Sequence, residues 1–327
     1  MGITHALDFL FPFMELRMPL KPSHIRPDFW KTLFTQRQLV WMSVPIIMYI
    51  ILFTYIPLAG WTMAFQNFKP FKAWNQQQWV GFQWFQTLFF DAQFAMTMRN
   101  TIAMSLINLV LGFFFAISLA LLLNEVKTQS IKKITQTVSY LPHFLSWVVV
   151  ASLVSTMLSS DGIFNVIFMK LGILKEPIVW LGVPKAFWWI LGFSNVWKEI
   201  GWNTIIYLAA MAAIDPTLYE ASEIDGCNRL SKMWHITLPG IKSTIVVLLI
   251  MNLGWIMESG FEAQYLLKNG MNQDYSWSID IYVVNYGLRN GNYALATAGG
   301  MFKSVVNIFL LLTANLISSK LGEEKLI

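Results

Sequence analysis

Apolar stretches that are too long for a soluble fold dominate this sequence. The segment between Arg37 and Lys69 carries no charged residue, and neither does the segment between Arg99 and Glu125. A helix needs about 20 mostly apolar residues to cross a bilayer, and both segments exceed that length. Only 13% of the residues are charged, whereas soluble domains carry about 25%. The sequence therefore predicts an all-α integral membrane protein.

Six segments qualify as transmembrane helices. Lys198 and Glu199 interrupt the fourth, Glu258 lies in the fifth, and Lys303 lies in the sixth. An even number of spans puts both termini on the same side of the membrane. The predicted spans are residues 39–60, 101–123, 141–159, 186–214, 241–260 and 293–319.

The distribution of basic residues favours cytoplasmic termini, because cytoplasmic loops carry an excess of Lys and Arg. In this orientation 13 basic residues are cytoplasmic: Arg17, Lys21, Arg26, Lys31, Arg37, Lys127, Lys132, Lys133, Arg229, Lys232, Lys242, Lys320 and Lys325. The opposite side holds 8: Lys69, Lys72, Arg99, Lys170, Lys175, Lys185, Lys268 and Arg289. The loop over residues 215–242 then faces the cytoplasm.

Three regions follow from this assignment. Residues 1–38 form a cytoplasmic or interfacial segment, residues 39–320 form the six-helix domain, and residues 321–327 form a cytoplasmic tail. Residues 28–37 fit a short interfacial amphipathic helix, and a plain linker is the alternative. The outer loops are long and rich in Trp, which fits either short helices on the membrane surface or a docking surface for an external protein.

The motifs of several enzyme classes are absent from the sequence. There is no phosphate-binding loop of the form G-x-x-x-x-G-K-[ST], no H-E-x-x-H motif and no G-x-S-x-G motif. The four histidines are too scattered to predict a metal site, and the single cysteine, Cys227, excludes an internal disulfide. The sequence gives no support to an enzyme.

Polar residues within the predicted spans are the candidate substrate pathway, since such residues are costly in lipid and usually face a cavity or a partner. Trp beside Asn, Lys and Glu suits a sugar, whose ring stacks on an aromatic face while its hydroxyls bond to polar groups. Lys198 would also suit a carboxylated sugar. The candidates are Asn195, Trp197, Lys198, Glu199, Trp202, Asn203, Asn252, Trp255, Glu258, Lys303 and Asn307.

Other interpretations of these groups remain open. Lys198 could pair with Glu258 as a structural contact, and Lys303 could extend towards the outer interface. The ionisable groups Lys198, Glu199, Glu258 and Lys303 could instead form the relay of an ion-coupled secondary transporter. A membrane receptor or scaffold that transports nothing is a third possibility.

The loop over residues 215–242 carries the start and stop signals of two short helices. Asp215 is a good N-cap and Pro216 suits the first helical position. Gly226 can end this helix in the left-handed conformation. A second helix is predicted from Asn228 to about Ile236, stopped by Pro239.

This loop resembles the EAA loop of ABC-importer permeases. Glu220-Ala221-Ser222, three residues, Gly226, nine residues and Ile236-Thr237-Leu238-Pro239 match E-A-A-x3-G-x9-I-x-L-P, with Ser222 in place of the second Ala. Six segments, at 55–60, 99–101, 197–210, 236–241, 260–262 and 296–307, look like the LplB-type branch of MalF-like sugar permeases. The similarity covers roughly residues 39–320, and alginate-oligosaccharide importers are the particular system it suggests.

The resemblance implies the type I ABC-importer permease fold and a place in the bacterial cytoplasmic (inner) membrane. The expected partners are a second, similar permease, two ATPase subunits, an extracytoplasmic solute-binding protein and an oligosaccharide. The chain itself would bind no cofactor and no metal, since ATP and magnesium would belong to the ATPase subunits. The residues expected to couple this chain to an ATPase subunit are Tyr219, Glu220, Ala221, Ser222, Asp225, Gly226, Met233, Trp234 and Pro239.

Overall fold

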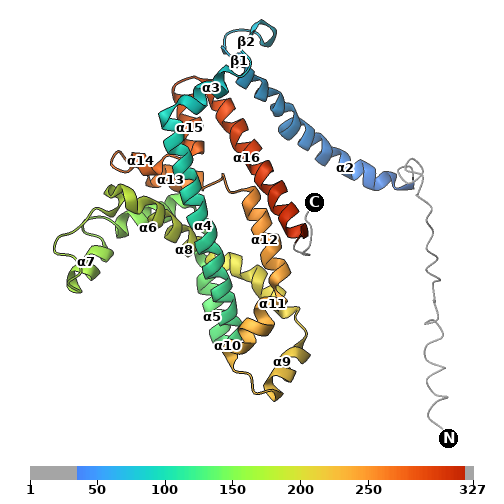
Figure 1. Ribbon diagram of the computed structural model, residues 1–327, viewed down its shortest axis with the longest axis vertical. Coiled ribbons are helices and arrows are strands. Elements are labelled where there is room, and N and C mark those ends of the chain that lie inside the picture. Colours follow the sequence, from blue (N-terminus) through green and yellow to red (C-terminus); the bar gives the residue numbers. More distant parts are fainter. Residues whose placement is uncertain (1–34, 321–327) are drawn as a thin grey trace. The chain divides into compact units, whose positions relative to one another are not determined.

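The computed structural model describes residues 35–320 of the chain (Figure 1). The predictions for the tail 321–327 and for nearly all of the N-terminal segment 1–38 lie outside the described residues. The chain divides into two compact units, residues 1–59 and residues 60–327.

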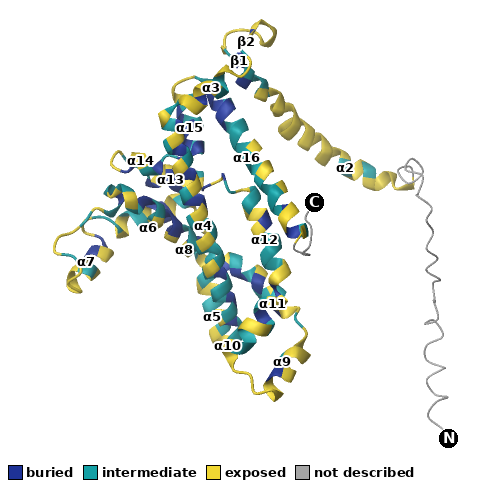
Figure 2. Ribbon diagram, in the orientation of Figure 1, coloured by how far each residue is buried: buried dark blue, intermediate teal, exposed yellow. Residues whose placement is uncertain are grey.

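The described part of the first unit is one continuous apolar helical segment. Helix α2 (Arg37–Ile50) passes into a π-helical turn (Ile51–Tyr55) and then into the 3-10 helix Ile56–Phe65. None of the residues of α2 is buried within the chain (Figure 2). Apolar side chains are exposed along the segment, such as Trp41 on α2 and Phe53 on the π-helical turn. A helix that is apolar all round needs lipid or another protein as its surroundings.

The second unit consists of helices and one small hairpin. The hairpin pairs β1 (Gln66–Asn67) with β2 (Gln78–Trp79), antiparallel, with Gln66 opposite Trp79. The α-helices are α3 (Gln83–Phe90), α4 (Ala92–Glu125), α5 (Gln129–Tyr140), α6 (Trp147–Met157), α7 (Ile163–Lys170), α8 (Phe187–Ala212), α9 (Pro216–Ile224), α10 (Arg229–Lys232), α11 (Leu238–Gly240), α12 (Lys242–Gly254), α13 (Phe261–Leu267), α14 (Gln273–Ser276), α15 (Ile279–Val284) and α16 (Tyr293–Lys320). Shorter turns are 3-10 at Trp74–Gln76, Leu141–Phe144, Trp180–Gly182 and Pro184–Ala186, and π-helical at Met233–Thr237 and Asn285–Arg289.

Helices α4 and α8 pack along each other and form the centre of this unit. Thr204 of α8 donates a hydrogen bond to the carbonyl of Ala116 on α4, at 3.2 Å. Gly201 of α8 lies directly against the backbone of α5 at Ser139. Helix α12 packs on α16, and α16 also contacts α3 and α15. These contacts allow the polar residues of α4, α8, α12 and α16 to face the spaces between the helices.

Three successive residues of α4 hold the segment that leads into α15. Asn100 Nδ2 donates to the carbonyls of Asp274 and Trp277, each at 3.0 Å. The backbone N–H of Ile279 donates to Thr101 Oγ1 at 3.0 Å. Arg99 reaches the same carbonyl of Asp274 at 2.8 Å. This segment is therefore fixed by side chains that lie about half the sequence away.

The described residues contain fewer clear membrane spans than the sequence predicts. Three helical stretches are long and apolar enough to cross a membrane, Arg37–Phe65, Ala92–Glu125 and Tyr293–Lys320, and two sharply bent helix pairs raise the number to five. Helix α8, the predicted fourth span, is continuous but does not qualify by composition, since polar residues such as Lys198 and Asn203 interrupt it. The all-helical prediction is confirmed, while the six spans stay a prediction.

The predicted third span, residues 141–159, is wrong as a single straight helix. The chain bends by 103° between Gln129–Phe144 and Trp147–Met157. Pro142 limits the preceding helix, and Ser146 begins α6 as its N-cap by accepting a hydrogen bond from the N–H of Val149. With 11 residues, α6 is too short to cross a bilayer alone.

Two further boundaries differ from the predictions. Helix α4 begins at Ala92 rather than residue 101, because the side chain of Asp91 caps it by accepting from the N–H of Gln93. Helix α12 ends at Gly254 rather than residue 260. The segment 255–260 is not helical, and Asn307 Oδ1 accepts a hydrogen bond from the N–H of Met257 at 3.1 Å. Gly260 closes this segment at a φ of 88°, which favours glycine.

Candidate functional site

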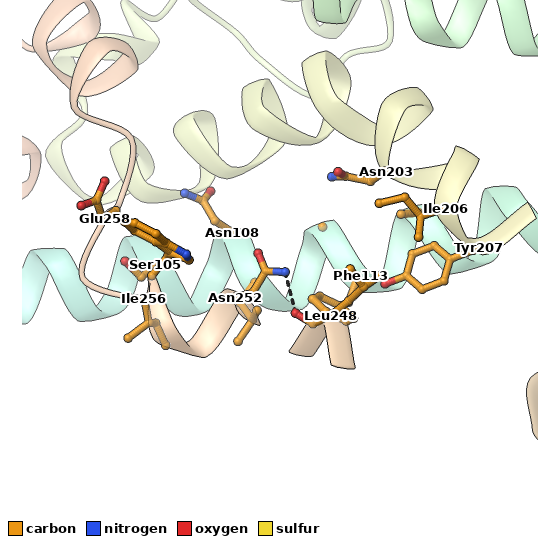
Figure 3. A pocket seen from close by; sticks show the side chains of 14 residues that line it. Ser105, Asn108, Phe113, Asn203, Ile206, Tyr207, Leu248, Asn252, Ile256 and Glu258 are labelled. Carbon is orange, nitrogen blue, oxygen red and sulfur yellow. Dashed lines mark hydrogen bonds between the residues drawn. The ribbon is translucent and has the colours of Figure 1, made fainter. Parts of the chain in front are cut away.

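Helices α4, α8 and α12 enclose two adjoining hollows of ≈ 220 and ≈ 320 Å³. Both hollows share Asn108 and Gly112 of α4, Asn203 of α8, Asn252 of α12 and Glu258 of the unwound segment. In Figure 3, Asn108 and Asn252 lie between Glu258 at one end and Tyr207 at the other. The shared lining makes these hollows one candidate cavity, which we call the amide cavity.

The amide cavity offers hydrogen-bonding groups beside an aromatic face. Asn195 Nδ2 donates to Asn108 Oδ1 at 3.0 Å, which fixes both amides on the wall. Ser105 and Tyr207 contribute hydroxyls to the lining. Trp255 lines the same space with an exposed ring. Amides and hydroxyls that both donate and accept, next to an aromatic ring, match a polyhydroxylated ligand.

A second pair of hollows, of ≈ 730 and ≈ 430 Å³, lies between the unwound segment, α15 and α16. Lys303 Nζ lies 2.6 Å from Asp280 Oδ1 and 3.1 Å from Glu258 Oε1. The side chain of Lys303 is mostly buried by these contacts. The suggestion that Lys303 extends to the outer interface is therefore wrong, since two carboxylates hold it within the protein.

Most of the predicted pathway residues line one of these spaces. The amide cavity is lined by Asn195, Glu199, Asn203, Asn252, Trp255 and Glu258. The second pair is lined by Trp255, Glu258, Lys303 and Asn307. Trp197, Lys198 and Trp202 line none of the four hollows, and Trp197 is exposed on another face of α8.

Lys198 is buried beside the bend between α5 and α6 rather than in a hollow. Its Nζ donates to the carbonyl of His143 at 2.7 Å and lies 3.1 Å from Glu199 Oε1. The suggested pair with Glu258 is therefore wrong. Trp202 stacks on the ring of His143, with ring centres 4.4 Å apart. Lys198 thus supplies a donor to a carbonyl that the bend leaves without a helical partner.

Lys198→Met is expected to lower the thermal stability of the protein without changing its preference among the sugars that the family resemblance predicts as substrates. The substitution leaves the carbonyl of His143 without its donor and Glu199 without its lysine, and an unsatisfied buried polar group costs about 1–3 kcal/mol. Thermal unfolding and uptake, each normalised to protein abundance, measure the two effects. Lys185→Met removes an exposed lysine and serves as the control. Altered preference at unchanged stability would instead assign Lys198 to the substrate.

Sequence reasoning missed several residues of the site. Asn108, Ser105 and Tyr207 line the amide cavity, Asp280 pairs with Lys303, and His143 accepts from Lys198. Asn108 is an amide in a charge-free apolar run, which is a signal that the polar-residue argument could have used. Nothing in the sequence indicates the partners of Asp280 and His143. Among residues 35–320, no three His, Cys, Asp or Glu side chains lie together as a metal site requires.

The loop over residues 215–242 forms two capped helices, as predicted. Asp215 begins α9 by accepting from the N–H of Thr217 at 2.9 Å, and this hydrogen bond holds the pKa of its carboxyl below the usual value. Gly226 follows α9 with a φ of 73°. Asn228 begins α10 by accepting from the N–H of Ser231. The hydrogen bond from Lys232 Nζ, 2.8 Å from Glu223, joins the two helices and lowers the pKa of Glu223.

The surface of this loop exposes apolar side chains beside acidic ones. Glu220, Ala221 and Asp225 are exposed. The most exposed large apolar side chain of this loop is that of Ile224, at 88%. Leu218, Leu230 and Trp234 are also exposed, and of these only Trp234 is among the predicted coupling residues. Exposed apolar side chains within a polar loop indicate a surface that a partner covers.

Three predicted coupling residues face inward. Ser222 is buried and donates to the carbonyl of Tyr219. Tyr219 is half-buried, and its hydroxyl lies 3.0 Å from Thr237 Oγ1. Met233 is also half-buried. These residues support the shape of the loop, so their contribution to a partner surface is smaller than that of Trp234.

Pro239 does not stop the second helix, which corrects that prediction. The helical segment runs from Arg229 through a π-helical turn at Met233–Thr237 into α11. The wider turn spares the proline the usual clash with a carbonyl one turn back. The chain bends by 60° after Gly240, where α12 begins.

Comparison with known proteins decides the family. A family model described as "Binding-protein-dependent transport system inner membrane component" matches residues 108–323, which is most of the chain. The chain belongs to this family. Within the matched residues this inner membrane component contains the 215–242 loop and all of the lining of the amide cavity except Ser105, and its resemblance to ABC-importer permeases is confirmed.

Curated relatives are similar over nearly their whole length. The permease is 43% identical over 300 residues to the polygalacturonan/rhamnogalacturonan transport system permease protein YteP of Bacillus subtilis (strain 168), which covers 89% of this chain and 91% of that protein. It is 39% identical over 286 residues to Protein LplB of the same strain, covering 87% and 89%.

A solved structure shares both fold and sequence. It is a bacterial alginate ABC transporter in complex with an alginate pentasaccharide-bound periplasmic protein. The matching chain is 38% identical to this permease with a TM-score of 0.84, covering 91% of this chain and 99% of that one. The permease therefore has the fold of an ABC transporter subunit that works with a periplasmic protein.

Proposed function

We propose that this chain is the membrane-spanning translocation subunit of an ATP-driven oligosaccharide importer. In this role six spans cross the bacterial inner membrane with both termini in the cytoplasm. The single observation that carries the proposal is the amide cavity, which lies in the same helical unit as the exposed 215–242 loop. The cavity offers a place for a sugar, and the loop offers a surface for the subunit that supplies energy.

The proposed assembly contains a second, similar permease, two ATPase subunits and an extracytoplasmic solute-binding protein. ATP and magnesium bind to the ATPase subunits, and this chain acts without catalysis or a cofactor of its own. The coupling surface consists of Glu220, Ala221, Asp225 and Trp234, supported from within by Tyr219, Ser222, Met233, Gly226 and Pro239. ATP-driven closure would move these helices and open the cavity to alternate sides.

The relatives point to the class of substrate. Polygalacturonan, rhamnogalacturonan and alginate, which appear in the names of the similar proteins, are all polysaccharides that contain uronic acids. We propose that this permease carries oligosaccharide fragments of this kind. The alternative of an ion-coupled carrier fits the structure poorly, since Lys198 and Lys303 are held in separate ion pairs and family members work with a binding protein.

The test is ATP hydrolysis by the complete complex in lipid. The complex of both permeases and the ATPase subunits, with the binding protein added, is expected to hydrolyse ATP faster when acidic or neutral oligosaccharides are supplied. Uptake of the same sugars into vesicles should require ATP and persist without an ion gradient. Transport by this chain alone, driven by an ion gradient, would overturn the proposal.

A further inference from the structure

One carboxylate reaches all four hollows of the site. Glu258 lies on the unwound segment after α12, and it lines both parts of the amide cavity and both hollows of the second pair. Its side chain is 49% exposed, compared with 22% for Asp280 and 13% for Lys303. A ligand in any of these spaces therefore meets the carboxylate of Glu258 before it meets the other two charges.

The cluster formed by Glu258, Asp280 and Lys303 carries an excess of negative charge. Two carboxylates share one ammonium group, and the shorter contact is the one to Asp280, at 2.6 Å. Within the described part of the chain, Lys303 is the one basic residue among those that line these four hollows, and it lines only the second pair. The formal charge of the cluster is −1, and Glu258 is the more exposed of its two carboxylates.

The other carboxylate on the cavity wall has both oxygens engaged. Glu199 Oε2 lies 2.7 Å from His143 Nδ1, and Oε1 lies 3.1 Å from Lys198 Nζ. Glu258 has one contact, from Oε1 to Lys303, among residues 35–320. Glu258 is therefore the carboxylate of this wall that is able to accept a hydrogen bond from a sugar hydroxyl. A hydroxyl that donates to a carboxylate forms a strong, charge-assisted hydrogen bond.

We propose that Glu258 determines specificity at this wall, an inference that rests on the proposed oligosaccharide import. Glu258 accepts a hydroxyl of the sugar, and the net charge of its cluster disfavours a substrate that presents a carboxylate there. An acidic oligosaccharide then passes with its hydroxyls towards this chain and its carboxylates towards the opposite side of the pathway. The cavity wall of this subunit thus recognises the uncharged features of the substrate.

Substitutions that change the net charge of the cluster test whether its negative charge disfavours acidic substrates. Asp280→Asn neutralises the cluster, Lys303→Met makes it more negative, and both leave Glu258 in place. The measurement is the initial rate of ATP-driven uptake by the complete transporter with one binding protein, for an oligogalacturonate and for its carboxyl-reduced, neutral counterpart. The ratio of the uptake rate of the acidic sugar to that of the neutral sugar is expected to rise about tenfold in Asp280→Asn and to fall in Lys303→Met. A single charge has an effect of this size because the dielectric constant in the cavity is lower than in water.

Two further variants distinguish an effect of Glu258 on substrate specificity from an effect on the structure of the protein. Glu258→Gln keeps the shape of the side chain and is expected to raise the acidic-to-neutral ratio while slowing the neutral sugar, which loses its charge-assisted hydrogen bond. Glu262→Gln on α13 removes the same charge from an exposed residue that lines none of the four hollows, and solvent screening should keep its ratio within about twofold of the parent.

The outcomes distinguish this inference from the proposed function. If neither sugar supports ATP-dependent uptake by the parent transporter, the proposed function fails. If the parent transports them but Asp280→Asn and Glu258→Gln leave the ratio unchanged, the inference about Glu258 is overturned and the function stands. Equal losses for both sugars in all cluster variants would show a purely structural role for the ion pairs.

Discussion

Gly226→Pro is expected to reduce substrate-stimulated ATP hydrolysis by more than tenfold while the chain still inserts into the membrane. Gly226 has a φ of 73°, and proline is confined to a φ of about −65°. The N–H of Gly226 also donates to the carbonyl of Glu223 at 3.1 Å, and the N–H of Cys227 donates to Ser222 at 2.9 Å. These two bonds form the C-terminal cap of α9, and proline removes the first of them.

The expected loss follows from the position of this cap. Without it, α9 no longer enters α10 at a fixed angle, and the exposed surface that includes Ile224 and Trp234 is no longer presented as one face. Co-purification of the ATPase subunits and ATP hydrolysis with and without substrate measure the effect. Membrane-extracted protein, quantified in parallel, separates failed coupling from failed insertion.

A matched variant isolates the backbone conformation. An added Cβ at Gly226 meets nothing within 4 Å, so Gly226→Asn tests the left-handed conformation without a steric clash. Asn tolerates this conformation and retains the N–H, and this variant is expected to keep most of the stimulation. Full stimulation in Gly226→Pro would show that the angle between α9 and α10 does not transmit the ATPase motion.

Gly201→Ala is expected to destabilise the subunit by about 2–3 kcal/mol, at the upper end of the usual cost of overpacking. A Cβ on Gly201 would lie 2.1 Å from the carbonyl oxygen of Ser139 and 2.8 Å from the ring of Tyr140. The first neighbour is backbone, so α5 must move away from α8. This movement would also disturb the bend that Lys198 stabilises, because that bend directly follows α5.

The measurement for Gly201→Ala is thermal unfolding of the purified complex, together with abundance in the membrane. Gly112→Ala on α4 is the control, since a Cβ there meets nothing within 4 Å. Replacing a glycine inside a helix by alanine stabilises by about 1 kcal/mol where space allows. Equal stability of the two variants would contradict the close approach of α8 to α5.

The sequence predicted well those elements whose signals are local. Helix α16 begins within a residue of the prediction because Asn292 caps it, accepting from the N–H of Leu295. The capped start of α9 and the glycine turn at Gly226 were also predicted correctly. In each case the residues that decide the structure lie within one helical turn of one another.

The helix breaks and ion-pair partners could not be predicted, because their causes are distant in the sequence. Helix α12 ends at Gly254 where the side chain of Asn307 binds the unwound backbone. The composition of residues 241–260, which is mostly apolar, does not indicate that contact. Lys198 likewise pairs with its neighbour and with a carbonyl of the α5–α6 bend, and only the path of the backbone reveals that this carbonyl is available.

The hydrogen bonds between residues 99–101 and the segment 274–279 have a consequence for the biogenesis of the protein. Asn100 and Thr101 leave the ribosome long before Asp274 and Trp277, to which Asn100 donates. During that interval the nascent α4 carries polar groups without their final partners, and closing so long a loop adds an entropic cost. The N-terminal part of α4 should therefore mature only after most of the chain is synthesised, so that a chain truncated before residue 274 is exposed to membrane proteases at this point.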